Sequence, residues 1–314
     1  MDIIFMDQWK DKRVFISGGS GVIGTALVNL LLEAGAMLLV GDLKPKPENW
    51  TNLYKYREGD LITLSKEEIQ EFSPECFFHL AATFERSIES SDFWHENFHH
   101  NILLSHHLLS LQKDLPSLKT IVFASSYLIY NHAEYLFSTP RKDPVSLKES
   151  GSIKPRNLCG MSKLFHEEEL QFIKKFRSDL QIVNARIFRS YGKNSRDIIS
   201  RWIQALLKGE PIKIYCQEGR FDFIYAEDVA KGLKALAESQ FNGTINLGSG
   251  RSRSIEEVFK ILEKHIDSFS FQVEETSIPY ESSQADMTLF HQIVKDFTFR
   301  SLEETIPDII KNIA

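Results

Sequence analysis

Long apolar runs and blocks of basic residues are missing from this sequence of 314 residues. The most apolar stretch, 26–40, is interrupted by polar residues and Gly35, so no segment is expected to span a membrane. The first eleven residues include Asp2 and Asp7 and lack a basic start followed by an apolar stretch, so no secretion signal is expected. With a net charge of −6 and no Lys/Arg-rich block, the chain is not expected to bind nucleic acid.

Cysteine is also scarce. The three cysteines, Cys76, Cys159 and Cys216, are widely spaced and odd in number, so neither a disulfide framework nor a structural zinc site is expected from them. This usage favours a reducing, cytoplasmic location. No Gly-x-Ser-x-Gly elbow occurs, which leaves a serine hydrolase unsupported.

What is present is a soluble, globular composition, with 42% hydrophobic and 25% charged residues. Short apolar runs alternate with helix-like segments, and the runs expected to be strands are 13–17, 36–42, 75–81, 120–125 and 182–188. This alternation predicts an α/β fold, a Rossmann-like doubly wound parallel sheet with a smaller C-terminal α+β substrate lobe.

The length favours two domains. We predict an NAD-binding Rossmann domain at 1–188, with 222–248 returning to it, and a substrate-binding lobe at 189–221 and 249–314. Residues 138–156 are rich in proline and are expected to form a long surface loop, a candidate lid.

A glycine-rich turn follows the first expected strand. Gly18, Gly21 and Gly24 would allow a tight turn, close approach of a pyrophosphate and close packing of helix on strand, respectively. The following helix would direct its N-terminus at the phosphates. The other residues expected at the cofactor in this turn are Ser20, Val22 and Ile23.

Asp42 closes the second expected strand, where a carboxylate accepts hydrogen bonds from an adenosine ribose. It would repel a 2′-phosphate, so NAD is favoured over NADP, a preference that Lys44 and Lys46 moderate.

Together with further motifs, these residues resemble the extended short-chain dehydrogenases/reductases, the NAD-dependent nucleotide-sugar epimerases and dehydratases. The resemblance covers nearly the whole chain. Its other motifs are His79-Leu-Ala-Ala82, Ser125-Ser126 with Tyr130, Arg186-Ile-Phe-Arg-Ser-Tyr-Gly192, Asp222-Phe-Ile-Tyr-Ala-Glu-Asp228, Asn246-Leu-Gly-Ser-Gly250 and Asp286.

The resemblance implies a set of site residues. At the cofactor it implies Asp60, Leu61, Leu80, Ala81, Ala82, Asn101 and Lys163. Catalysis would involve Ser126, Cys159 and Lys163. The substrate, a nucleotide-diphosphate sugar, would contact Thr83, Ser126, Arg189 and Arg220.

The catalytic motif of the family is Tyr-x-x-x-Lys. This chain has Cys159-Gly-Met-Ser-Lys163 in its place, so the lysine is kept and the tyrosine is replaced by Cys159. A thiol, with a pKa of about 8.5, is acidic enough to replace a phenol. It is, however, roughly 3–4 Å shorter, and a base must come within about 2.6–3.2 Å of its proton or act through a water. Three alternatives stay open: Cys159 acts directly, Tyr127 or Tyr130 moves in, or Cys159 only packs while Ser126, water or the substrate transfers the proton.

Other departures concern the substrate. Arg189 stands where the family often has Asn and offers a fork for a diphosphate or carboxylate, with a structural ion pair as the alternative. The family's Arg-Asp reads Phe221-Asp222 here, and Arg220, one residue earlier, is the residue expected at the diphosphate. The acidic pair of sugar 4,6-dehydratases is replaced by Tyr127 and Leu128, which disfavours that reaction.

Four histidines, at 99, 100, 106 and 107, suggest a metal site at first sight. Those that share a helix face are seven residues apart, about 10.5 Å of rise, so no metal site is expected among them. The resemblance instead implies that helices 92–111 and 158–176 form a homodimer bundle.

The resulting hypothesis is an NAD-dependent epimerase that works through a transient 4-keto sugar. The alternatives are a nucleotide-sugar dehydratase, decarboxylase or dehydrogenase on the same scaffold, or a non-catalytic NAD-binding protein that has lost its acid/base.

Overall fold

The computed structural model describes residues 8–83, 90–267 and 269–313, so the expectation about the first eleven residues falls mostly outside the described chain. The chain divides into two compact units. The first consists of Met1–Ile129, Pro155–Ala185 and Ala230–Thr244, and the second of Tyr130–Lys154, Arg186–Val229 and Ile245–Ala314. None of the described helices is long and apolar enough to cross a membrane.

A seven-stranded sheet forms the centre of the α/β fold, in the order β12-β8-β5-β4-β1-β2-β3. Its strands are β1 (Arg13–Ser17), β2 (Met37–Asp42), β3 (Lys55–Glu58), β4 (Cys76–His79), β5 (Thr120–Ser126), β8 (Gln181–Ile187) and β12 (Gly243–Leu247). β1 pairs in parallel with both β2 and β4, and the pairs β2–β3 and β4–β5 are parallel too. The strand order reverses between β1 and β4, which is where Rossmann-like sheets bind dinucleotides.

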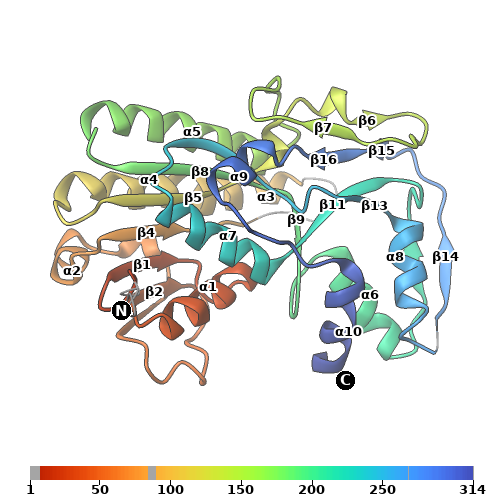
Figure 1. Cartoon of the computed structure of the whole chain (residues 1–314), viewed down its shortest axis with the longest axis horizontal. Coiled ribbons are helices and arrows are strands. Elements are labelled where there is room, and N and C mark those ends of the chain that lie inside the picture. The colour runs from red at the N-terminus through yellow and green to blue at the C-terminus, as the bar shows by residue number, and fades with distance from the viewer. Residues whose placement is uncertain (1–7, 84–89, 268, 314) are drawn as a thin grey trace, which may run out of the picture. The chain divides into compact units, whose positions relative to one another are not determined.

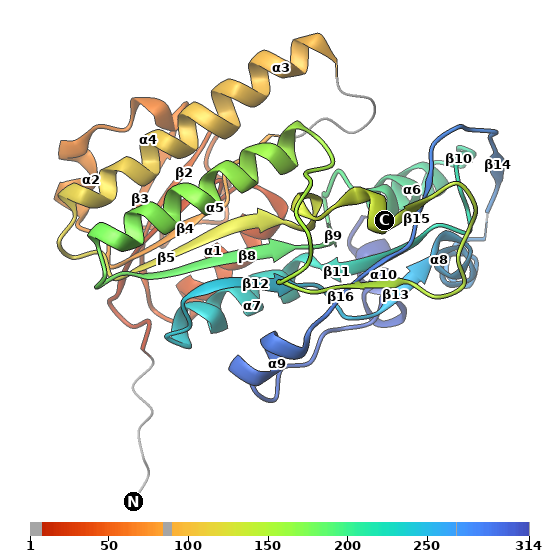
Figure 2. The same cartoon turned by 90° about the horizontal axis from the view of Figure 1, so that it is seen from above.

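Helices cover both faces of this sheet. The helices of the first unit are α1 (Val22–Glu33), α2 (Lys66–Phe72), α3 (Ser91–Asn97), α4 (Leu104–Ser110), α5 (Leu158–Phe176) and most of α7 (Ala226–Glu238). Figures 1 and 2 show α4 and α5 on one face and α1 and α7 on the other. The predicted Rossmann-like doubly wound sheet is therefore confirmed.

The predicted helix 92–111 is one continuous helical rod with an irregular middle. Between α3 and α4, Phe98–Leu103 forms a π-helical turn. π-Turns inside α-helices widen the spacing of side chains and occur often at functional sites. Short 3₁₀ turns lie at Leu61–Thr63, Leu111–Asp114, Tyr127–Ile129 and His132–Glu134.

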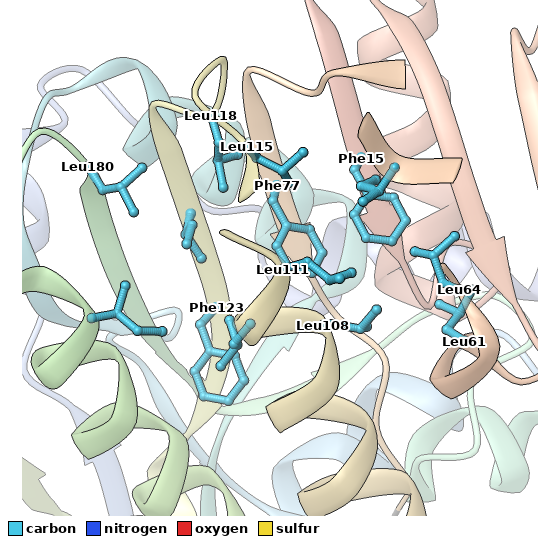
Figure 3. Packing of buried hydrophobic residues seen from close by; sticks show 14 of the residues in the cluster. Phe15, Leu61, Leu64, Phe77, Leu108, Leu111, Leu115, Leu118, Phe123 and Leu180 are labelled. Carbon is cyan, nitrogen blue, oxygen red and sulfur yellow. The ribbon is translucent and has the colours of Figure 1, made fainter. Parts of the chain in front are cut away.

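One buried hydrophobic cluster of the first unit lies between the sheet and the helices α4 and α5. Phe15 and Phe77 stack on neighbouring strands with ring centroids 4.7 Å apart. Figure 3 shows Leu111 from the helical layer beside the Phe77 ring. This packing fixes the strand ends that carry the candidate site.

The second unit contains small sheets and helices. Its strands are β6 (Leu136–Phe137), β7 (Val145–Leu147), β9 (Arg189–Tyr191), β10 (Ile212–Ile214), β11 (Arg220–Tyr225), β13 (Ser252–Ser254), β14 (Phe271–Val273), β15 (Tyr280–Glu281) and β16 (Ser283–Ala285). Its helices are α6 (Ile198–Leu207), α8 (Ile255–Leu262), α9 (Thr288–Ile293) and α10 (Leu302–Ile313).

The segment 130–154 belongs to this second unit, whereas the predicted boundaries assign it to the Rossmann domain. β6 pairs with β15, and β7 pairs with β16, so two strands tie the segment to residues 280–285. The expected surface loop 138–156 therefore contains a paired strand.

Candidate functional site

The glycine-rich turn connects β1 to α1 and has the backbone geometry that its sequence predicts. Gly18 has a φ of 75°, and a Cβ there would lie 2.6 Å from the Ala81 nitrogen. A Cβ on Gly24 would lie 2.2 Å from the Gly18 carbonyl oxygen. Gly18 thus permits the turn, and Gly24 permits the helix to pack against it.

The start of α1 fits a dinucleotide pyrophosphate. Gly21 is the N-cap, and none of the described side chains caps this helix end. A Cβ on Gly21 would lie 3.2 Å from the Gly18 oxygen, closer than most real Cβ contacts, so glycine suits this position. The Ser20 hydroxyl is buried without a hydrogen-bond partner among the described residues. N–H groups without a side-chain cap and a nearby hydroxyl are what an anion at a helix N-terminus needs.

Asp42 lies at the end of β2, beside this turn. One carboxylate oxygen accepts from the Ser20 N–H at 2.9 Å, and the other accepts from the Lys44 N–H at 3.0 Å. These bonds hold the carboxylate next to the turn. Each oxygen keeps a second lone pair, so the group still has the capacity to accept from a ribose hydroxyl.

The ends of β3 and β4 supply the other predicted cofactor residues. Leu61 is buried and packs against Gly41, since a Cβ on Gly41 would lie 2.5 Å from the Leu61 side chain. Leu80 is joined to the turn because its N–H donates to the Ser17 oxygen at 3.0 Å. Ala81 is half-buried and Ala82 is exposed.

Asn101 fixes the segment that follows. Its amide oxygen accepts from the Thr83 N–H at 2.8 Å, and its amide nitrogen donates to the Thr83 oxygen at 2.8 Å. The same nitrogen donates to Asn97 at 2.8 Å. The Thr83 hydroxyl pairs with Glu96. The structure therefore gives Asn101 a positioning role for the Thr83 backbone.

Asp60 is bonded to a histidine from the helical layer. His99 Nε2 lies 2.6 Å from one carboxylate oxygen, and the Ile62 N–H donates to the other at 3.0 Å. Burial acts to raise the pKa of Asp60, but the hydrogen bonds from His99 and Ile62 outweigh it and lower this pKa below its usual value. Asp60 is therefore a carboxylate at neutral pH.

Ser126 ends β5, and a 3₁₀ turn follows it. The Ser126 hydroxyl accepts from the Leu128 N–H at 3.2 Å. This turn packs closely on the start of α5, since a Cβ on Gly160 would lie 2.6 Å from the Leu128 oxygen. The structure thereby brings Ser126 and Cys159 into neighbouring segments.

Lys163 lies one helical turn after Cys159, and both side chains are buried. The Lys163 ammonium lies over the Phe123 ring, 4.7 Å from its centroid. Burial lowers the pKa of Lys163, and the neighbouring Cys159 acts in the opposite direction. Lysines whose pKa is lowered by burial occur often at functional sites.

Tyr127 and Tyr130, the two tyrosines considered as substitutes for the missing one, do not lie on the same strand as Ser126. β5 ends at Ser126 and Tyr127 belongs to the turn, so the alternation of side chains along a strand does not apply to it. Tyr130 belongs to the second unit, where its hydroxyl donates to Asn246 at 2.6 Å and its ring lies 4.8 Å from the Arg186 guanidinium.

The two predicted substrate arginines both form ion pairs in the second unit. Arg189 pairs with the buried Glu281 at 2.8 Å and lies over the Phe221 ring at 4.2 Å. Arg220 pairs with Glu257 at 3.0 Å, and its Nε is buried without a partner among the described residues. Arg220 therefore keeps one unused donor.

Sequence reasoning missed several buried polar side chains near the end of β5 and the neighbouring helices. The Ser125 hydroxyl donates to the buried Glu167 at 2.5 Å. His166 contacts the Asn101 oxygen at 2.7 Å and Glu169 at 2.8 Å. Glu167 follows Lys163 by four residues, so spacing along α5 was the one signal that could have indicated it.

His79 is another buried group in this region. Its Nδ1 lies 2.6 Å from the Ser17 hydroxyl, and its Nε2 has no partner among the described residues. Burial lowers the pKa of His79 well below its usual value, and the nearby Lys163 adds to this effect. His79 is therefore a neutral imidazole at the end of β4, where the strand order of the sheet reverses.

Comparisons with known proteins define the class. Residues 14–248 match the model of the NAD dependent epimerase/dehydratase family. A putative UDP-glucose 4-epimerase of Methanocaldococcus jannaschii is 27% identical over 270 residues, covering 81% of this chain and 82% of that protein.

Two solved structures extend the comparison. A UDP-N-acetylglucosamine 4-epimerase from Methanobrevibacter ruminantium, in complex with UDP-N-acetylmuramic acid, is similar with a TM-score of 0.82 and 27% identity, covering 96% of this chain and 98% of the other. MoeE5, in complex with UDP-glucose and NAD, gives a TM-score of 0.80 and 26% identity, covering 95% of this chain and 97% of the other.

The fold, the glycine turn and the strand-end residues define a Rossmann-like dinucleotide-binding enzyme. The family match covers well over half of the chain, so this protein belongs to the NAD dependent epimerase/dehydratase family. The predicted family and the predicted cofactor, NAD, are thereby confirmed.

Proposed function

We propose that this protein is an NAD-dependent nucleotide-sugar epimerase that works through a transient 4-keto sugar. The observation that carries the proposal is the open N-terminus of α1 beside Asp42, in a chain that retains Ser126 and Lys163. The similarity to a putative UDP-glucose 4-epimerase and to a UDP-N-acetylglucosamine 4-epimerase supports the reaction class.

The proposed chemistry needs a proton acceptor and a hydride acceptor. NAD, when bound, supplies the acceptor and later the donor of one hydride. The chain takes the proton of the sugar hydroxyl. After the keto sugar has turned its other face to the cofactor and the hydride has returned there, the chain gives the proton back to the sugar oxygen. We assign this proton exchange to Ser126, Cys159 and Lys163, and burial, which lowers the pKa of Lys163, makes this lysine easier to deprotonate.

The cofactor would be held by three groups of residues in the first unit. Gly18, Gly21 and Gly24, with Ser20, Val22 and Ile23, would hold the pyrophosphate. Asp42 would accept from the ribose. The remaining proposed contacts are Asp60, Leu61, Leu80, Ala81, Ala82, Asn101 and Lys163.

For the nucleotide-sugar substrate, we propose contacts from Thr83, Ser126, Arg189 and Arg220. The unused Nε of Arg220 supports its assignment to a phosphate oxygen. Arg189 would share its guanidinium between Glu281 and the substrate.

The test is incubation of the purified protein with UDP-, GDP-, CDP- and dTDP-sugars in deuterated water, followed by NMR and mass spectrometry. An epimerase acting at C4 returns a C4-inverted sugar without solvent deuterium. Loss of mass, or deuterium next to the ketone, would replace the proposal with a dehydratase, decarboxylase or C3/C5 reaction. A steady change in nicotinamide absorbance would indicate a dehydrogenase.

Catalytic competence is tested with variants at Cys159. If the thiol exchanges the proton, Cys159→Ala lowers turnover by about 10²–10⁴. If Cys159 only packs, Cys159→Ala leaves turnover within a few-fold of the parent. A chain that binds NAD but turns over no sugar, and that gains activity in Cys159→Tyr, is a binding protein that has lost its acid/base.

We further propose a homodimer formed through helices 92–111 and 158–176. Large apolar side chains are exposed on both, although soluble monomers rarely expose contiguous apolar patches of this kind. They are Trp94, Phe98, Leu103, Met161, Phe165, Phe172 and Phe176.

The dimer is tested by sedimentation of Phe165→Glu, with Val273→Glu as the control. Phe165 is exposed on α5, and Val273 is exposed on β14 of the second unit. We expect Phe165→Glu to give monomers and Val273→Glu to leave the dimer intact. Equal masses for the parent and both variants would contradict the proposal. The scarcity of cysteine supports a cytoplasmic location for this assembly.

A further inference from the structure

Three side chains from two distant segments meet beside the π-turn of the helical layer. Asp60 follows β3, while His99 and His100 belong to the turn Phe98–Leu103. One donor atom from each of the three lies within 4.8 Å of the other two. We propose that Asp60, His99 and His100 form a binding site for a divalent transition metal ion of the zinc type.

The donor set selects the class of ion. Two imidazole nitrogens and one carboxylate oxygen suit Zn²⁺, Co²⁺ or Ni²⁺ better than Mg²⁺ or Ca²⁺, which prefer oxygen ligands alone. Three protein ligands leave a fourth position for water.

The distances require only small movements. In a tetrahedral site with bonds of about 2.0–2.1 Å, neighbouring ligand atoms stand about 3.3 Å apart. His99 Nε2 and the Asp60 oxygen, now 2.6 Å apart, would separate by roughly 0.7 Å. The widest allowed separation of 4.8 Å would have to contract by roughly 1.5 Å. Rotation of half-exposed side chains covers both changes.

One backbone hydrogen bond orients Asp60, and a ring contact joins the two histidines. The Ile62 N–H holds one Asp60 oxygen at 3.0 Å, which leaves the other oxygen facing His99. His99 and His100 meet edge to face, with ring centroids 4.7 Å apart. His100 Nδ1 is buried without a partner among the described residues.

An ion can reach this site from solvent. The side chains of His99 and Asp60 are 43% and 28% exposed. The ion would replace the proton between them, because His99 must be neutral and Asp60 ionised to bind it. Metal binding therefore weakens as the pH falls.

The site has a regulatory consequence, which rests on the proposed function. Asp60 is one of the residues proposed above to contact NAD. An ion held by Asp60 would then compete with the cofactor, so each ligand lowers the affinity for the other by the same factor.

Cobalt absorption spectroscopy tests the site without any assay of activity. Co²⁺ is added to protein freed of NAD, and the d–d bands of tetrahedral Co²⁺ are followed. We expect one Co²⁺ per chain, and at least tenfold weaker binding in both His99→Gln and His100→Gln. His106→Gln is the matched control, since His106 lies on the same helical rod but pairs with Glu169.

The outcomes are distinct. Absence of the bands in the parent, or binding that survives both His99→Gln and His100→Gln, overturns the site; thermal melts of the variants confirm that they are folded. A second titration is made with NAD bound. At least tenfold weaker Co²⁺ binding supports competition, whereas unchanged binding refutes the competition and leaves the metal site standing. The sugar panel described above tests the enzymatic function separately.

Discussion

Two helices of the first unit begin in opposite ways. The N-cap of α1 is Gly21, and none of the described side chains caps this helix, whereas the N-cap of α5 is Asn157, whose side chain accepts from the Gly160 N–H at 2.9 Å. An uncapped end leaves N–H groups for a ligand. A capped end fixes the first turn, which here carries Cys159 ahead of Lys163. The start of α1 can thus bind an anion, whereas the start of α5 holds its first side chains in place.

The largest effect is expected from Gly18→Ala, which breaks the turn ahead of α1. The new Cβ would lie 2.6 Å from the Ala81 nitrogen, and the φ of 75° is strained for any L side chain. We expect NAD affinity to fall by at least about 100-fold and the melting temperature to fall as well. Isothermal titration with NAD and a thermal melt measure the two effects.

Gly209→Ala is the matched control for this substitution. Gly209 has a φ of 72°, but a Cβ there would meet nothing within 4 Å. Gly209→Ala should therefore lose only the folding free energy that the strained backbone costs, about 1 kcal/mol. If both variants lost the same stability and both kept NAD, the close approach at Gly18 would play no part in cofactor binding.

The next effect concerns α5. Lys163→Met is expected to lower turnover by about 10²–10⁴ while the chain stays folded. Burial lowers the pKa of Lys163, so charging it costs folding free energy below its folded pKa, and this cost disappears as the pH rises toward the usual lysine value. The variant should therefore be relatively most stable at low pH and lose that advantage at high pH.

Thermal melts across pH, run beside the turnover assay, check this prediction. Lys174→Met is the control, because Lys174 lies on the same helix and donates to the Ser178 oxygen at 2.9 Å. If Lys174→Met lost as much turnover as Lys163→Met, or if Lys163→Met were destabilised most at low pH, the role assigned to Lys163 would be wrong.

A smaller effect is expected when α1 is made to resemble α5. Gly21→Asp places a capping carboxylate at a residue with φ −68° and ψ 170°, a conformation that aspartate adopts readily. We expect the melting temperature to be maintained and NAD affinity to fall by about 10- to 100-fold, 1.4–2.8 kcal/mol. Titration with NAD measures this, with Gly21→Ala separating loss of space from added charge. Unchanged affinity in Gly21→Asp would mean that the helix start does not face the phosphates.

The two helix starts also differ in how far the sequence predicts them. The glycine turn is local, so the spacing of Gly18, Gly21 and Gly24 indicated both the fold and the cofactor. Some hydrogen-bond partners of α5 are not local, since Glu167 accepts from Ser125, which is 42 residues away. Spacing along one segment carries no information about such pairs.

The histidines illustrate the same limit. Considered along a single helix, their spacing predicts no metal site. The structure adds Asp60, 39 residues before His99, and a π-turn that the apolar pattern of 92–111 did not indicate. Chain-distant ligands and irregular helical turns are set by tertiary packing, which periodicity does not report.

The smallest effect is expected from Asn157→Ala, which makes α5 resemble α1. Removing the side-chain cap costs about 1 kcal/mol of folding free energy. NAD affinity should fall by less than in Gly21→Asp, because the pyrophosphate is proposed to lie at α1 and Lys163 is the one proposed NAD contact on α5. Chemical denaturation and NAD titration measure the two quantities, and Asn157→Asp, which retains the cap, should restore the lost stability. A fall in NAD affinity in Asn157→Ala that Asn157→Asp did not repair would show that the two helix starts are not separate in function.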